Sequence, residues 1–146
     1  MSNASPLALV LDLAVNSRDA IARQVATAQK LVDDGQAQLV SLTRYHGEYL
    51  ARAGNQNQLD AATLINFNAF IERLETAIQQ QRNTVEHHRA RVEALKADHV
   101  RAATKVKSLE QLAAARVAEQ RLVEARAERK LEDEHATRAA RLKVEI

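Results

Sequence analysis

The chain of 146 residues has no cysteine and no tryptophan, and contains only one proline, three glycines, two phenylalanines and two tyrosines. The absence of cysteine excludes disulfides and thiol chemistry. Average sequences contain about 7% Gly and 5% Pro, so this one has too few turn residues for a β-sandwich, a β-barrel or an alternating α/β fold. Alanine supplies much of the 46% apolar content. We therefore do not expect a compact enzyme with a formed pocket.

The residues that are present favour long helices. Alanine, glutamine and 27% charged residues are typical of helical chains. The 21 basic and 19 acidic residues are interleaved, so the basic stripe of a nucleic-acid-binding protein is missing. The apolar run from Leu7 to Val15 is too short to span a bilayer and contains Asp12. No basic residue precedes this run, as one would in a signal peptide, and we expect a cytosolic protein.

Capping residues predict two helices. Ser5 is a suitable N-cap and Pro6 a suitable first helical residue. Gly54 can adopt the left-handed conformation that ends a helix. Asp60 can cap the next helix, with Leu59 and Leu64 at the positions of a hydrophobic staple. The prediction is a single domain, with a helix over about 6–53, a loop over about 54–59 and a helix over about 60–141.

Both helices carry an apolar repeat of 3.5 residues, the pattern of a left-handed coiled coil. In the first helix the repeat runs through Leu7, Leu11, Ala14, Arg18, Ile21, Val25, Ala28, Val32, Gly35, Leu39, Leu42, His46 and Tyr49. In the second it runs through Leu64, Phe67, Ile71, Leu74, Ile78, Gln81, Val85, His88, Val92, Leu95, His99, Ala102, Val106, Leu109 and Ala113. We call these positions the seam. The fold class predicted is an all-α, antiparallel two-helix coiled-coil hairpin.

A short loop makes the two helices antiparallel. Pairing Tyr49 with Leu64 sets a trial register in which Leu7 faces Val106. The same register pairs Leu42 with Ile71, Leu39 with Leu74 and Ile21 with Val92. The last 40 residues then have no partner within the chain and form a helical overhang of roughly 60 Å. The overhang is either frayed or reserved for another protein.

Five polar residues interrupt the seam: Arg18, His46, Gln81, His88 and His99. A metal site or a pH switch is one interpretation, but no His or carboxylate spacing supports zinc. Register control is the favoured interpretation, because a polar seam residue specifies alignment. Gly35 either marks a bend or makes room for Ile78. No glycine-rich phosphate loop and no recognisable nucleophile is present, so no catalytic residue, cofactor or metal is expected.

Several segments occur in a characteristic order. They are Leu7–Ala14, Leu42–Tyr49 with its Tyr-x-x-Glu-Tyr, Leu64–Leu74 continuing to Gln81, Lys105–Leu112 and Glu128–Glu134. Together they resemble the FliJ family of flagellar export proteins over essentially the whole chain. His99 departs from the family pattern, since many relatives carry Trp there. The resemblance implies a long two-helix coil similar to the coiled-coil part of the rotary ATPase γ subunit.

The resemblance also implies partners. The end with both termini would enter the pore of the hexameric flagellar export ATPase, and the loop-side half would contact the cytoplasmic linker of the export-gate membrane protein. Export chaperones are further partners. The implied location is the cytoplasm at the flagellar base, where the protein would associate peripherally with the inner membrane only through its partners. The gate-binding surface carries over to Gln38, Leu42, Tyr45, Tyr49, Phe70, Leu74, Ala77 and Gln81.

Charges alternate along the overhang, which suits a polar, salt-sensitive contact inside a ring. We assign the ATPase-ring contact to Arg126, Glu128, Arg129, Lys130, Asp133 and Glu134. The predicted function is a non-enzymatic stalk that promotes ring assembly and couples ATP hydrolysis to export. The alternatives are an escort of export chaperones, the equivalent stalk of a virulence type III secretion system, and a scaffold that self-associates through Val117 to Val144.

Overall fold

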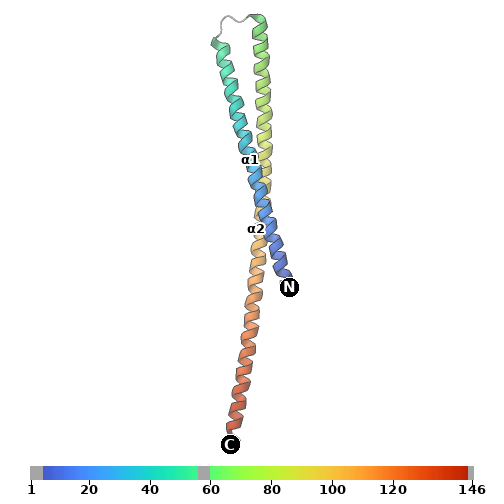
Figure 1. The fold of residues 1–146 in the computed structure, drawn as a ribbon, viewed down its shortest axis with the longest axis vertical. Coiled ribbons are helices and arrows are strands. Elements are labelled where there is room, and N and C mark those ends of the chain that lie inside the picture. The colour runs from blue at the N-terminus through green and yellow to red at the C-terminus, as the bar shows by residue number, and fades with distance from the viewer. Residues whose placement is uncertain (1–4, 56–59, 145–146) are drawn as a thin grey trace. The chain divides into compact units, whose positions relative to one another are not determined.

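The computed structural model describes residues 5–55 and 60–144, and within these ranges every residue except Ser5 and Asp60 is helical. Helix α1 spans Pro6–Asn55 and helix α2 spans Ala61–Val144 (Figure 1). The predicted all-α hairpin of two long helices is confirmed. Both helices end two or three residues later than the sequence predicted.

Both helices begin at the predicted caps. The backbone N–H of Ala8 donates to Ser5 Oγ at 3.2 Å, and that of Thr63 donates to Asp60 Oδ1 at 2.7 Å. Hydrogen bonds from Thr63, first from its side chain and then from its backbone, lower the pKa of Asp60. Leu59, the first member of the predicted staple, lies outside the described residues. Ser5 and Asp60 each satisfy a helix N–H that has no partner within the helix.

The left-handed turn predicted at Gly54 is wrong. None of the three glycines, all of which are described, has a positive φ, and α1 continues through Gly54 to Asn55. Nothing lies within 4 Å of the place where a Cβ of Gly54 would stand. Glycine permits the left-handed conformation but does not require it.

The chain divides into two compact units, which are described separately. The loop unit is residues 18–101, and here α1 and α2 pack antiparallel. Its central cluster consists of Ala28, Val32, Val92 and Leu95, with Val25 packed against it. Every seam position of this unit is buried or half-buried except Leu64, which is 44% exposed. The 3.5-residue repeat therefore identified the packed face correctly.

The trial register is wrong by about one heptad. In the loop unit the Tyr49 ring packs at a tilt against the rings of Phe67 and Phe70, rather than pairing with Leu64. Gly35 lies against Val85, not Ile78. A shift of seven residues returns every seam position to an equivalent place, so the stripes alone could not distinguish the two registers.

The terminal unit is residues 1–17 and 102–146. Ala14 and Val106 are buried in it, at 6% and 2% exposure. Leu7 and Leu11 line one groove with Ala113 and Val117, so the predicted pairing of Leu7 with Val106 is also wrong by about a heptad. The overhang consequently begins later than predicted. Residues 114–144 are all exposed, and they form about 46 Å of helix.

Candidate partner-binding surfaces

The structure brings the eight residues of the implied gate-binding surface to one edge of the loop unit. We call them the edge patch: Gln38, Leu42, Tyr45, Tyr49, Phe70, Leu74, Ala77 and Gln81. Two contacts between the helices show this arrangement directly. The rings of Tyr49 and Phe70 lie 4.7 Å apart, and Gln81 Nε2 donates to Gln38 Oε1 at 3.2 Å. Residues from two separate sequence segments thus meet at this edge.

An aromatic cluster lies at the loop end of the edge patch. Tyr49 is half-buried, with its ring centroid 5.8 Å from that of Phe67 and 4.7 Å from that of Phe70. The guanidinium of Arg52 lies 5.5 Å from the centre of the Tyr49 ring, a distance at which a cation and an aromatic face attract each other. Sequence reasoning placed Phe67 in the seam but did not predict its contact with Tyr49, because the trial register separated them.

Members of the edge patch differ in exposure. Tyr45 is 50% exposed, Phe70 is 37% exposed, and Gln38 is also exposed. All three lie off the seam, as the repeat predicts. The other five members are half-buried: Leu42, Tyr49, Leu74, Ala77 and Gln81. The half-buried residues contribute to packing between the helices, which leaves Tyr45, Phe70 and Gln38 as the members most open to a partner.

A shallow groove runs along α1 beside Tyr45. Gln38, Leu42 and Tyr45 line it together with Ala37 and Ser41. Ala37 and Ser41 were not predicted as site residues. Their small side chains at positions next to Gln38 and Leu42 are the signal that could have identified them. The groove is mostly apolar, so it suits an apolar side chain better than a charged one.

Polar side chains also connect the two helices of the loop unit. Gln81 Nε2 donates to the carbonyl oxygen of Gly35 at 3.0 Å. His46 Nε2 lies 3.1 Å from Glu75 Oε1, and Arg89 Nη2 donates to Gln36 Oε1 at 3.2 Å. The Gln81 contact supports register control. Among the described residues, no group of His, Cys, Asp and Glu is arranged to hold a metal ion.

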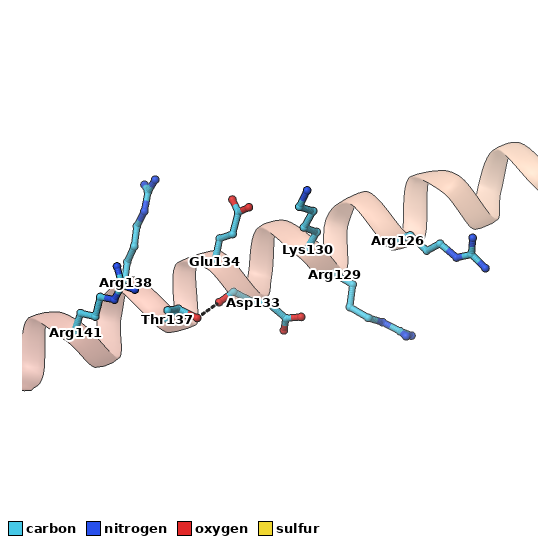
Figure 2. Close-up of a pocket in the computed structure, with 8 residues that line it drawn as sticks. All are labelled: Arg126, Arg129, Lys130, Asp133, Glu134, Thr137, Arg138 and Arg141. Carbon is cyan, nitrogen blue, oxygen red and sulfur yellow. Dashed lines mark hydrogen bonds between the residues drawn. The ribbon is translucent and has the colours of Figure 1, made fainter.

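The overhang carries the second candidate surface, which Figure 2 shows in close-up. We call it the overhang patch; it is lined by Arg126, Arg129, Lys130, Asp133, Glu134, Thr137, Arg138 and Arg141. Lys130, Glu134 and Arg138 extend from one side of the helix, and Arg129 and Asp133 from the other. The patch contains five of the six predicted ring-contact residues. Glu128 is exposed but does not line the patch.

Five of the eight residues of the overhang patch are basic and two are acidic. Sequence reasoning missed Thr137, Arg138 and Arg141, although the two arginines continue the same charged pattern. Thr137 Oγ1 donates to the backbone carbonyl of Asp133 at 2.8 Å. Among residues 114–144 no ion pair is present, and the charged side chains of this segment are all exposed.

The geometry defines a coiled-coil hairpin with two exposed surfaces, one in each unit. Within the described residues no helix is both long and apolar enough to cross a bilayer. The family model described as flagellar FliJ protein matches residues 2–145 of the 146-residue chain. The chain therefore belongs to the FliJ family of flagellar export proteins. No curated protein and no solved structure gives a significant match.

Proposed function

We propose that this flagellar export protein is a non-enzymatic stalk that docks to the hexameric export ATPase and to the export-gate membrane protein. Docking promotes assembly of the ATPase ring and couples ATP hydrolysis to export. The observation that supports the proposal is the edge patch, in which Tyr49 contacts Phe70 and Gln81 contacts Gln38 between residues for which the family resemblance implies gate binding. The chain acts as one coiled-coil domain with no chemistry of its own.

The edge patch has the composition of a binding surface. Tyr45 lines the apolar groove of α1, and Phe70 is a second partly exposed aromatic ring of the edge patch. Aromatic residues dominate the free energy of many interfaces, because their large surfaces bury well at little conformational cost. The ring centroid of Tyr49 lies 4.7 Å from that of Phe70, so Tyr49 helps to fix the position of the Phe70 ring. We infer that Tyr45 and Phe70 are the main contacts to the cytoplasmic linker of the gate.

The overhang patch suits the ATPase ring. Its side chains are exposed and of both signs. Charges exposed on a surface steer association and fix orientation more than they add affinity, and salt screens them over about 8 Å at physiological ionic strength. A contact of this kind is reversible. The protein would act in the cytoplasm, peripheral to the inner membrane at the flagellar base through its partners, and would also meet export chaperones.

Substitution of the exposed rings tests the gate contact. We expect Tyr45→Ala with Phe70→Ala to weaken binding to the gate linker at least tenfold while helicity is retained. Leu50→Ala is the matched control, because Leu50 is 46% exposed near the same end but lies five residues from Tyr45, on a different helix face. Unchanged gate binding in a folded double variant would remove these rings from the site.

Removal of residues 124–146 tests the ring contact. We expect the shortened chain to lose stimulation of ring assembly and ATPase activity while it keeps gate binding. Charge reversal at Arg126, Arg129 and Lys130 should have the same effect, and the stimulation by the unaltered chain should decline with added salt. If neither variant changes ATPase activity, the stalk function is wrong. If these variants still bind export chaperones and still stimulate the ATPase ring normally, the escort function is favoured.

A further inference from the structure

Two registers of the loop unit satisfy the apolar stripes. In the register found, Gly35 lies against Val85, and Ala28 and Val92 belong to one buried cluster. In the register one heptad away, Gly35 would face Ile78 and Ile21 would face Val92. Every seam position stays in the seam in both cases. Some feature other than the apolar repeat must therefore select the register.

We propose that Gly35 and Gln81 form a register lock that excludes the neighbouring register. Gln81 Nε2 donates to the carbonyl oxygen of Gly35 at 3.0 Å and to Gln38 Oε1 at 3.2 Å. Gly35 is buried, and Gln81 is half-buried. The lock therefore consists of one side-chain amide in the seam and the two oxygens of α1 that it reaches.

The missing side chain of Gly35 makes this contact possible. A Cβ at Gly35 would stand 3.1 Å from Val85 Cγ2 and 3.4 Å from Gln81 Nε2. A side chain at position 35 would therefore crowd Val85 and the Gln81 amide, and one of these neighbours would have to shift by a few tenths of an ångström. Gly47 and Gly54 have no atom within 4 Å of the corresponding place, so among the three glycines the neighbouring helix comes this close at Gly35 alone.

The neighbouring register would leave the Gln81 amide without these acceptors. There Gln81 would face Val32, whose side chain has no hydrogen-bonding group. Gln81 is half-buried, so the part of its amide that the packing covers would lose hydration without gaining a hydrogen bond in return. A mismatched polar seam residue therefore penalises the wrong alignment, in the way that a single polar residue specifies register in other coiled coils.

The lock gives Gln81 a role different from a direct partner contact. Gln81 is a positioning residue: by fixing the register, it places Phe70 against Tyr49 and holds Gln38 at the edge. The inference depends only on the packing of this chain, so it stands or fails independently of gate binding.

The cysteine-free chain allows the register to be measured directly. Ala28→Cys with Val92→Cys reports the register found, and Ile21→Cys with Val92→Cys reports its neighbour. The full-length variants are equilibrated in a glutathione buffer, and the intramolecular disulfide of each is quantified by mass spectrometry. In the otherwise unaltered chain we expect the Ala28 pair to close at least tenfold more favourably than the Ile21 pair.

Gln81→Leu in both cysteine backgrounds should reduce this preference at least tenfold, because an apolar residue fits either register. Gln81→Glu keeps the size of the side chain but removes its N–H donors, and should also reduce the preference. Gln79→Leu is the matched control, since Gln79 bonds only to Asn83 within α2, and should leave the preference unchanged. If both Gln81 variants remain helical and keep the full preference for the Ala28 pair, the register lock is refuted.

Discussion

Replacing glycine by alanine at two positions of α1 separates helix propensity from packing. Alanine favours a helix interior over glycine by about 1 kcal/mol, and both Gly35 and Gly47 lie within α1. At Gly47 a Cβ would meet nothing within 4 Å. Gly47→Ala should therefore stabilise the chain by about 1 kcal/mol, or raise the melting temperature by about 2–4 °C for a chain of this size.

At Gly35 the same substitution encounters a packed helix. The new Cβ would stand 3.1 Å from Val85 Cγ2, and Val85 is only 2% exposed. A β-branched residue in a helix has one strongly preferred χ1 rotamer, so Val85 cannot turn away. Overpacking of this kind costs about 1–3 kcal/mol. Subtracting the propensity gain, we expect Gly35→Ala to destabilise the chain by about 1 kcal/mol.

The two variants are compared by urea and thermal unfolding, followed by circular dichroism at 222 nm. The expected difference between them is about 2 kcal/mol, with opposite signs relative to the unaltered chain. The reasoning is refuted if Gly35→Ala stabilises the chain as much as Gly47→Ala does. That result would mean that α2 does not approach α1 closely at Gly35.

Three further predictions concern the loop end and the overhang. The folded-state pKa of Asp60 is lowered, so its ionised carboxylate stabilises the folded chain at pH values above the unfolded pKa of about 4. This stabilisation is lost as the pH falls through the folded-state pKa. Asp60→Asn, which still caps the helix, should remove this pH dependence in an acid titration in which helicity is measured. Tyr49→Ala should lower the free energy of unfolding by about 2 kcal/mol, because the contacts of the half-buried ring with two phenylalanines are lost. Tyr45→Ala should change it by less than about 0.5 kcal/mol. If urea unfolding gives the same loss of stability for both variants, this distinction is contradicted. The described side chains of residues 124–146 are all exposed. Removal of these residues should therefore change the free energy of unfolding in urea by less than about 0.5 kcal/mol. A larger change would show that the overhang packs against the rest of the chain.

The sequence by itself determined the fold class, the caps at Ser5 and Asp60 and the packed face of each helix. These features depend on local properties: the scarcity of turn residues, the side-chain oxygens at the caps, and a repeat of 3.5 residues that any partner helix would have to bury. The residues of the edge patch were named from the family resemblance. The exposure of Tyr45 and Phe70 followed from their positions beside the seam.

Only the tertiary structure decided the register. The register in turn sets the start of the overhang, the contacts of the Tyr49 ring with Phe67 and Phe70, and the hydrogen bond from Gln81 to Gly35. The physical reason is that a heptad shift preserves the whole apolar pattern. What distinguishes the two registers is the hydrogen bond from the Gln81 amide on one helix to the backbone carbonyl of Gly35 on the other, where no side chain intervenes. Neither sequence segment alone shows that the two residues meet.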